Sequence, residues 1–377
     1  MLEIVFWLAV GLLVYTHVGY PLLLRALVAL RGRSQATPPP LADADLPRLS
    51  LIVAAHDEET VIAARVQNAL ALDYPRERLE VIVASDGSSD RTAELAREAG
   101  ADVVLELPRE GKVAALNAGV ERAGGDVLAF SDANSAWEPD AARRLTERLL
   151  SNDEIGYVCG QVGFSGQESE NQEGLYWRYE MSVRALESDL AGITGGNGAI
   201  NAVRREDYLF LEPERGQDIT VPFRTVKAGR RPVYEPKAVA RERLAPTLGD
   251  EFTRKRRMHA GAWATMLDGG MLSPRGYDPM YWLEIASHRL LRYASPFLHL
   301  AALVTNLFLL GEGWIYIATL AAQLALLAVA LLAPLVPLWP FRVARYYLSV
   351  TAASALGLWD YLRRGVPVTW QKAEGTR

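Results

Sequence analysis

Apolar residues gather at the two ends of the chain, and charged residues gather between them. The N-terminal apolar run extends from Leu2 to Leu30, whereas Asp, Glu, Lys and Arg are concentrated between Leu46 and Gly276. This partition predicts a soluble domain held between membrane segments. The predicted segments are an N-terminal transmembrane anchor at 1–33, a linker at 34–47, a soluble domain at 48–276 and a C-terminal membrane region at 277–377.

The N-terminal run has the flanks of a membrane anchor. It is longer than the apolar core of a signal peptide and has no basic start, which disfavours the alternative of a cleaved signal. Glu3 lies near one end, and Arg25, Arg31 and Arg33 lie near the other. Under the positive-inside rule, these charges place the following domain in the cytosol. Because proline removes a helical hydrogen bond, Gly19-Tyr20-Pro21 predicts a kink.

Short β-rich runs alternate with helical stretches in the soluble domain. The linker before it contains Pro38-Pro39-Pro40, and the runs that follow are LSLIVAA, LEVIVAS, ADVVLEL and DVLAFSD. Helical stretches begin near Asp57, Asp90, Gly111 and Pro139. This order predicts an α/β fold with a mainly parallel, Rossmann-like sheet and flanking helices. Ligands of such sheets bind beyond the C-terminal ends of the strands.

The region after Gly276 predicts further membrane contact. Tyr281 to Arg292 is aromatic and basic, as expected of a helix at the membrane interface. Ser295 to Leu310 and Gly313 to Leu332 predict a hairpin of two spans, with buried helices of a soluble domain as the alternative. Phe341 to Trp359 has too short an uncharged part to span, so we expect an interfacial or re-entrant helix and a cytosolic C-terminus.

Charge and cysteine content exclude several classes of protein. The net charge of -5 argues against nucleic acid as a partner. Cys159 is the only cysteine, so the chain has no internal disulfide framework and no thiolate metal site. Both features fit a reducing compartment.

Polar residues follow three of the expected strands, where a ligand would bind. Asp86, in S-D-G-S-S-D, could accept hydrogen bonds from a base or a ribose, or could simply form an Asp-Gly turn. Asp132 and Asn134 have one residue between them, so their side chains point the same way and could share a divalent cation. A turn or a helix cap is the alternative for this pair.

Three further positions carry charge that suits a diphosphate or an acceptor hydroxyl. Lys112 opens a helix after a glycine, where ammonium and helix N-terminus both attract negative charge, although a solvated surface lysine has the same pattern. Asp218 precedes a helix and is either a general base or an N-cap. The basic run from Arg254 to Arg257 could hold a diphosphate or face anionic lipid.

The order of these motifs resembles the membrane-bound branch of family 2 glycosyltransferases, which have the A-type nucleotide-sugar fold (GT-A). That branch includes polysaccharide synthases and lipid-linked sugar transferases, and the resemblance covers Leu49 to about Leu267. The motifs are A-A-H-D-E-E, S-D-G-S-S-D-R-T, G-K-V-A-A-L-N-A-G, S-D-A-N-S, G-G-N-G-A-I-N-A-V-R-R, Q-D-I-T and R-K-R-R-M-H-A-G-A-W.

The resemblance assigns roles to individual positions. Asp218 matches the catalytic base, and Asp132 and Asn134 match the Asp-X-Asp metal motif, for which Mg²⁺ or Mn²⁺ is the expected cofactor. The positions that match nucleotide-sugar contacts are Ala54, Ala55, Glu58, Asp86, Lys112, Asp132 and Arg257. The acceptor-side positions are Gly195, Gly196, Asn197, Arg254 and Met258.

Three positions depart from the family pattern. Asn134 replaces the second Asp of the metal motif and contributes an oxygen without charge, which predicts weaker metal binding. Gln217 replaces the Glu that precedes the base in many relatives. In the Gln-X-X-Arg-Trp motif of processive synthases, Arg254 and Met258 replace the Gln and the Trp, and only Arg257 is kept. The loss of the Trp favours transfer of one or a few sugars over long-chain polymerisation.

The resemblance implies an inverting transfer by single in-line displacement from a nucleotide-diphospho-sugar, with a UDP-sugar favoured. A lipid carrier or a growing polysaccharide at the membrane is the expected acceptor, and the plasma (inner) membrane, with the catalytic domain in the cytosol, is the expected location. A processive synthase is the alternative within the class, and a non-catalytic sugar-nucleotide sensor or scaffold is the alternative outside it. A nucleotidyltransferase would need a Gly-rich phosphate loop after the first strand. This chain has A-A-H-D-E-E there, so that class is disfavoured. Neither the sugar nor the oligomeric state follows from the sequence.

Overall fold

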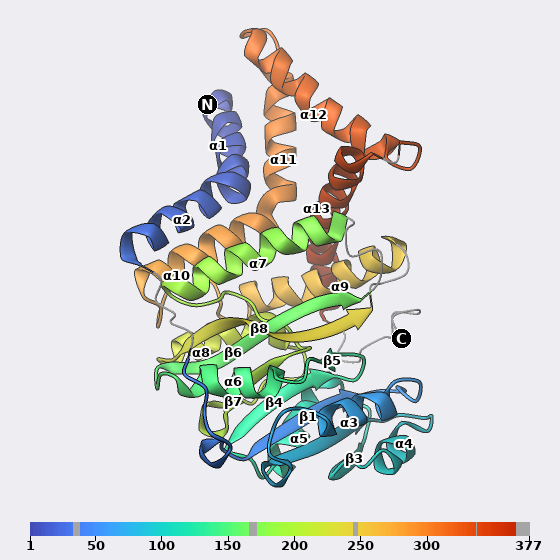
Figure 1. Cartoon of the computed structure of the whole chain (residues 1–377). Coiled ribbons are helices and arrows are strands. Elements are labelled where there is room, and N and C mark those ends of the chain that lie inside the picture. The colour runs from blue at the N-terminus through green and yellow to red at the C-terminus, as the bar shows by residue number, and fades with distance from the viewer. Residues whose placement is uncertain (33–37, 166–171, 244–247, 337, 367–377) are drawn as a thin grey trace.

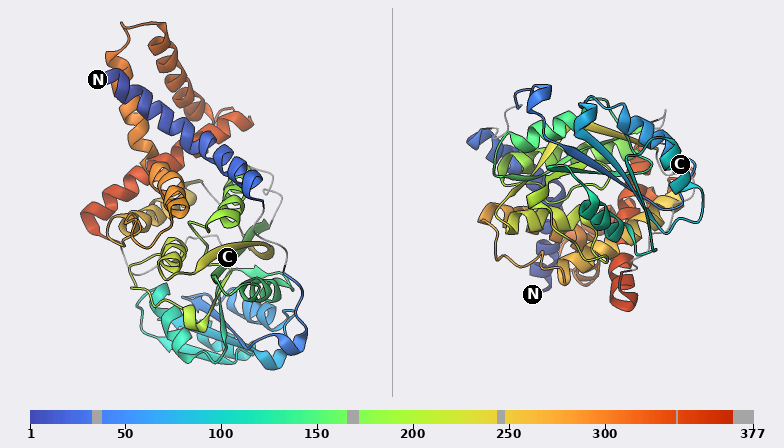
Figure 2. Two further views of the ribbon diagram at one scale, coloured as in Figure 1. Left: turned by 90° about the vertical axis from the view of Figure 1, so that its left-hand side faces the viewer. Right: turned by 90° about the horizontal axis from the view of Figure 1, so that it is seen from below.

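A computed structural model describes residues 1–32, 38–165, 172–243, 248–336 and 338–366. An α/β domain occupies one end of the molecule, and a group of long helices rises from the other end (Figure 1). Figure 2 shows that the N-terminal helix lies among these long helices, beside segments from the C-terminal part of the chain. The predicted arrangement of one domain between two helical ends is therefore present.

The domain is built on a single sheet of eight strands in the order β3-β2-β1-β4-β7-β6-β8-β5. Parallel pairing joins β1 to β2 and β4, β2 to β3, and β6 to β8, whereas β7 and β5 pair antiparallel with their neighbours. Six of the described strands thus run in one direction, and the mainly parallel sheet is confirmed. The strands are β1 Leu49–Ala55, β2 Leu79–Asp86, β3 Val103–Leu107, β4 Val127–Asp132, β5 Ala136–Trp137, β6 Ile155–Ser165, β7 Asn201–Arg204 and β8 Arg231–Arg243.

Apolar residues cover both faces of the sheet, as a mainly parallel sheet requires. On one face, Ile62 and Leu145 pack against Leu51 and Val53 in a cluster that α3, α4 and α6 cover. On the other face, Leu116 packs with Ile52 under α5, α7 and α8. The helices are α3 Ile62–Leu70, α4 Thr92–Glu98, α5 Lys112–Arg122, α6 Ala141–Leu150, α7 Gln172–Leu190 and α8 Gln217–Lys227.

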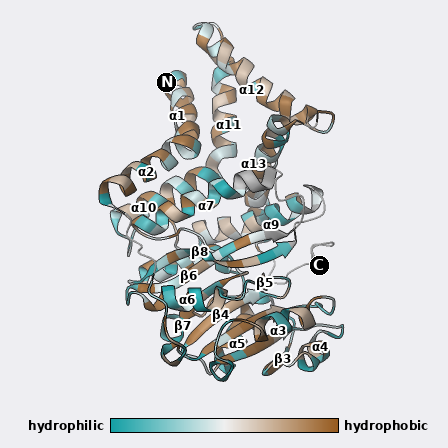
Figure 3. Cartoon of the chain, in the orientation of Figure 1, coloured by the Kyte–Doolittle hydropathy of each residue, from teal (hydrophilic) through white to brown (hydrophobic). Residues whose placement is uncertain are grey.

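One further helix, α9 Leu248–Leu267, lies within the predicted soluble domain. The regions that the sequence assigns to the membrane contain α1 Leu2–Val14, α2 Tyr20–Arg31, α10 Pro279–Glu284, α11 Leu291–Phe308, α12 Trp314–Leu332 and α13 Trp339–Arg364. Hydrophobic residues dominate α1 and α12 (Figure 3). Among the described residues, two helices are long and apolar enough to cross a membrane, Leu2–Arg31 and Trp314–Leu332. The predicted span at Ser295 to Leu310 overlaps α11, which is not one of these two helices, so that span stays a prediction.

The predicted kink in the N-terminal helix is confirmed. A π-helical turn at Tyr15–Gly19 separates α1 from α2, and Pro21 follows it in the first turn of α2. The two segments run in different directions in Figure 1. Phe341 to Trp359, expected to be interfacial or re-entrant, lies within the unbroken 26-residue helix α13, which packs along α9. Arg33, the start of the linker and the end of the tail lie outside the described residues.

Candidate active site

The carboxyl ends of β1, β2 and β4 bring the first predicted contacts together. Ala54 is aligned with Ala84 of β2 on one side and with Asp132 of β4 on the other. Ala54 and Ala55 are fully buried. Glu58 lies in the turn that follows, where its backbone N–H donates to Thr92 Oγ1 at 2.7 Å. The sheet therefore gathers these positions at one edge, as the sequence predicts.

Asp86 holds the loop that precedes α5. Its carboxylate accepts hydrogen bonds from the backbone N–H of Glu110 at 2.7 Å and of Gly111 at 3.0 Å, and the side chain is buried. Gly87 has a positive φ of 59°, and a Cβ there would lie 2.7 Å from the Cβ of Arg109. The Asp86-Gly87 turn thus allows the loop before α5 to pack closely against the end of β2. A direct contact between Asp86 and a nucleotide stays a prediction.

Lys112 and Asp132 form an ion pair at the N-terminus of α5. Both side chains are partly exposed, at 22% and 27% of their surface. Burial, the largest single effect, lowers the pKa of Lys112, but the carboxylates of Asp132, Asp218 and Glu242 outweigh it and hold that pKa above its usual value. The ammonium therefore stays charged among several carboxylates, and its contact with a phosphate group stays a prediction.

Asp218 lies in the first turn of α8, as its second residue. Gly216 is the N-cap of α8, so the N-cap interpretation of Asp218 is wrong. Burial raises the pKa of the Asp218 carboxyl above its usual value, and Asp132 adds to the rise while Lys112 opposes it. A carboxylate with a raised pKa is a stronger proton acceptor than an ordinary aspartate, as a general base requires.

The turn at Gly195, Gly196 and Asn197 lies directly against Asp218. The N–H of Gly196 donates to the carbonyl oxygen of Asp218 at 2.7 Å. A Cβ on Gly196 would lie 2.1 Å from the Tyr157 hydroxyl, so only glycine fits there. The Asn197 amide donates to Gly160 O at 2.9 Å and accepts from Ile200 N at 2.9 Å. These bonds fix the turn beside the reaction centre and leave Asn197 engaged with the protein.

Gly198 marks the point where the charged groups converge. A Cβ on Gly198 would lie 2.6 Å from Lys112 Nζ, 2.6 Å from Gln217 Nε2 and 3.4 Å from Asp218 Oδ1. Three residues from α5 and α8 thus meet over one glycine of the loop before β7. The sequence predicts Lys112 and Asp218 separately, and the fold brings them together.

Glu242 is a member of this cluster that the sequence analysis missed. It lies near the end of β8 and accepts a hydrogen bond from Ser135 Oγ. Burial raises the pKa of Glu242 above its usual value, and the neighbouring Asp132 carboxylate adds to that rise. The motifs of the parallel half of the sheet gave no signal for it, because β8 reaches this edge only through the pairing of β8 with β6.

The side chains of the basic run on α9 bond to different partners and do not converge on one site. Arg254 makes two bonds to Glu251, at 2.8 and 2.9 Å, and Arg256 makes two bonds to Asp360 of α13, at 2.5 and 2.6 Å. Burial, with the charge of Arg254, lowers the pKa of Arg257. Met258, which replaces the family's Trp, is 42% exposed. Of the run, Arg254 is the residue whose charge also reaches Asp218 and Glu242.

The side chains predicted to bind a metal lie at and just after the end of β4. Among the described residues, no group of three or more His, Cys, Asp or Glu side chains is arranged to hold a metal. Asp132 and Asn134 nevertheless offer a carboxylate and an amide, both oxygen donors that suit Mg²⁺ or Mn²⁺. Magnesium often takes one or two protein oxygens and completes its shell with water and substrate phosphates. The pair fits a metal that binds together with a diphosphate, and metal binding stays a prediction.

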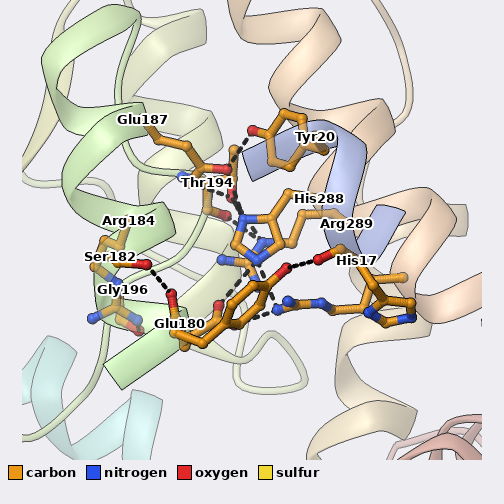
Figure 4. A network of polar contacts seen from close by, with 12 residues as sticks. His17, Tyr20, Glu180, Ser182, Arg184, Glu187, Thr194, Gly196, His288 and Arg289 are labelled. Carbon is orange, nitrogen blue, oxygen red and sulfur yellow. Dashed lines mark hydrogen bonds and ion pairs between the residues drawn. The ribbon is translucent and has the colours of Figure 1, made fainter. Parts of the chain in front are cut away.

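A buried polar network joins the turn at Gly195–Asn197 and the residue before it to α2 and the π-helical turn Ile285–Leu290 (Figure 4). Glu187 of α7 bonds to His288 Nδ1 at 2.6 Å, to the Tyr20 hydroxyl at 2.7 Å and to Thr194 Oγ1 at 3.1 Å. Arg289, next to His288, donates to the carbonyl of Thr194 at 3.1 Å. Sequence reasoning missed this network, because its members come from α2, α7, the 190s loop and the π-helical turn Ile285–Leu290.

The mixed sheet with helices on both faces is of the GT-A type of nucleotide-sugar fold, and Lys112, Asp132 and Asp218 lie together at the ends of its strands. Residues 50–209, less than half of the chain, match the family model "Glycosyl transferase family 2". This part of the chain is therefore a family 2 glycosyltransferase domain, and the resemblance inferred from the motifs is confirmed.

Relatives agree with this assignment. The chain is 35% identical over 125 residues to "Probable glycosyltransferase YdaM" of Bacillus subtilis (strain 168), covering 31% of this chain and 30% of that protein. It is 26% identical over 234 residues to "Poly-beta-1,6-N-acetyl-D-glucosamine synthase" of Staphylococcus aureus (strain COL), covering 59% and 56%. These matches thus span about a third and about half of the length of the curated relatives.

A solved structure shares the fold over nearly the whole chain. It is the mannosyltransferase PcManGT from Pyrobaculum calidifontis in complex with GDP-Man and Mn²⁺, with a TM-score of 0.74 and 23% sequence identity. The alignment covers 96% of this chain and 99% of that chain. At this identity the likeness establishes the fold alone, and it includes the helical regions at both ends of the domain.

Proposed function

We propose that this protein transfers a sugar, with inversion, from a nucleotide-diphospho-sugar to an acceptor at a membrane surface. The observation that carries the proposal is the convergence of Lys112 and Asp218 over Gly198, with Asp132 paired to Lys112. An ammonium for the diphosphate and a carboxylate for the acceptor proton are the two groups that an in-line displacement needs.

Lys112 and Asp132 would hold the leaving group. The α5 N-terminus and the Lys112 ammonium both attract the diphosphate, and the ion pair to Asp132 orients Lys112 before donor binds. Asp132 and Asn134 would bind the metal, which when bound neutralises charge on the departing diphosphate. A UDP-sugar remains the favoured donor, and the GDP-mannose bound by the Pyrobaculum structural relative makes GDP-sugars the first comparison.

Asp218 would act on the acceptor, which reaches it from the membrane side. The turn at Gly195–Asn197 separates Asp218 from the network that contains Tyr20 of the N-terminal helix. A lipid-linked sugar or a membrane-bound glycan could therefore approach the base along the same face as the candidate spans. An entirely soluble acceptor gives no reason for this placement.

A processive synthase is the second candidate, favoured by the similarity to the Staphylococcus poly-N-acetylglucosamine synthase. Met258 argues against this candidate. It occupies the position of the Trp that the resemblance associates with processive synthesis. The two candidates predict products of different length. One or a few added sugars support the first candidate, and a ladder of long products supports the second.

The test is a screen of UDP- and GDP-sugars with the full chain in membrane extract, with product mass measured. We expect one donor series to give a membrane-bound product that disappears in excess chelator. Asp218→Asn is the matched inactive variant. If no donor is transferred or hydrolysed with any divalent metal, the protein is a sugar-nucleotide-binding scaffold and the proposed activity is wrong.

A further inference from the structure

A pocket beside the Lys112–Asp218 cluster is lined by residues of α5, α8 and the central strands β4 and β7. About 450 Å³ of space that protein atoms do not fill lies along its wall, and this volume includes open solvent. Most of its wall is apolar, and the residues that matter here are Val113, Leu116, Phe130, Val203, Gln217 and Val221. No role assigned above uses this space.

The pocket adjoins the groups proposed to perform the transfer. Val113 follows Lys112 on α5, and Gln217 precedes Asp218 on α8. Gln217 Nε2 and Lys112 Nζ each lie 2.6 Å from the position of a Cβ on Gly198. We consider a donor with its diphosphate at Lys112 and the reacting carbon of its sugar facing Asp218. The substituent on the carbon next to the reacting one would then point toward Gln217.

Gln217 carries an amide nitrogen that is buried and has no hydrogen-bond partner in the described part of the chain. Other polar groups on the wall are engaged: the Tyr208 hydroxyl donates to Asn117 at 2.8 Å, and the Asn201 amide donates to Asn197 O at 2.9 Å. Buried donors are paired in nearly all native structures, because an unpaired one is destabilising. The Gln217 N–H group is thus available to an acceptor on a bound ligand.

We propose that this pocket receives an N-acyl group, such as the 2-acetamido group of an N-acetylhexosamine, carried by the donor sugar. The acyl carbonyl would accept from Gln217 Nε2, and the methyl group would pack on the apolar wall of Val113, Leu116 and Phe130. A hydroxyl group in the same place would carry an O–H group that finds no hydrogen-bond acceptor on the apolar wall. The carbon that bears the acetamido group adjoins the reacting carbon, which agrees with the approach of both Gln217 Nε2 and Asp218 Oδ1 to Gly198. This inference rests on the proposed use of a sugar nucleotide.

The test compares UDP-N-acetylglucosamine with UDP-glucose, which differ only at that carbon, using the full chain purified in detergent. We expect kcat/KM to be at least about 10-fold higher for the N-acetyl donor, since a buried polar group left unpaired is penalised. Gln217→Leu should remove most of that preference, mainly through a higher KM for UDP-N-acetylglucosamine. Gln67→Leu, at an exposed position of α3, is the matched control and should keep the preference.

Binding gives a readout that does not depend on turnover. In saturation-transfer NMR, the acetyl methyl of UDP-N-acetylglucosamine should receive strong saturation from the wild type and weak saturation from Gln217→Leu. Thermal unfolding of each variant shows that it is folded, and Gln217→Glu, which keeps the shape but repels the acyl oxygen, repeats the test. Equal kcat/KM and binding for the two donors, or an unchanged preference in folded Gln217→Leu, would overturn the inference and leave the proposed function standing. If no sugar nucleotide is bound or turned over, both are wrong.

Discussion

Glu187 Oε1 and His288 Nδ1 lie 2.6 Å apart in the interior, although 101 residues separate them in the chain. Glu187 is fully buried, and its other bonds reach Tyr20 on the N-terminal helix and Thr194 at the acceptor-side turn. Burial alone would raise the pKa of Glu187, but His288 and Arg289 outweigh it and hold that pKa below its usual value. An ionised buried carboxylate thus ties α2 and the π-helical turn Ile285–Leu290 to the turn beside Asp218.

We therefore expect Glu187→Gln to destabilise the protein by roughly 3–5 kcal/mol, because it leaves neighbouring buried cationic groups without their carboxylate. Thermal unfolding in detergent measures the change. Glu98→Gln, at an exposed position of α4, is the control and should unfold like the wild type. Equal unfolding of both variants would show that the network carries no stability.

Replacing Asp218 by Asn should lower the transfer rate by roughly 10²–10⁴-fold, because Asn keeps the shape but cannot take the acceptor proton. Donor affinity should change little, since a base acts on the acceptor in the transition state. Asp86→Ala should instead lose donor binding, because it frees the Glu110–Gly111 loop as well as any nucleotide contact. Initial rates and nucleotide affinity distinguish the two, and near-normal turnover by Asp218→Asn would move the base to another carboxylate, with Glu242 the first to test.

Transfer should decline as pH falls, with a midpoint above the usual value of an aspartate. The pKa of Asp218 is raised by burial, so this carboxylate is protonated, and inactive as a base, at a higher pH than an exposed one. Activity is therefore present above the pKa of Asp218 in the folded protein and lost below it. A kcat/KM profile against pH measures the midpoint, and activity that stays level down to pH about 3.9, the ordinary aspartate value, would exclude Asp218 as the titrating base.

Changing Asn134 to Asp should tighten metal binding, because a second carboxylate adds charge next to Asp132. Asp132→Ala should weaken it. Titration with Mn²⁺ followed by electron paramagnetic resonance, in the presence of nucleoside diphosphate, measures both affinities without turnover. Unchanged affinity in both variants, or full transfer activity in excess chelator, would place the metal elsewhere or remove it from the reaction.

The N-terminus should lie outside the cytosol and the C-terminus inside it, as the arginine flanks predict. Cys159 is fully buried, so a membrane-impermeant thiol reagent reports only on cysteines introduced at the ends. Labelling from outside should modify Glu3→Cys and spare Gly375→Cys, which lies outside the described residues. The opposite pattern would reverse the orientation of the catalytic domain.

The sequence by itself determined the parallel half of the domain and the residues at its edge. Strands β1 to β4 are short local patterns of apolar residues between helices. Asp86 and Asp132 end β2 and β4, and Lys112 begins the helix that follows β3. Because parallel strands end at one edge, their order in the sequence was enough to predict that these side chains gather. The resemblance to the family rested on the same local motifs, and the family match confirmed it.

Only the tertiary structure decided the rest of the site. Glu242 joins the cluster through β8, and Gln217 faces its pocket because α8 packs across from α5 on the same face of the sheet. The Glu187–His288 contact depends on how the π-helical turn Ile285–Leu290 packs against α7. Each of these is a contact between elements far apart in the chain. Local propensity specifies where an element begins and ends, whereas the partner of a buried polar group is set by the packing of all the elements around it.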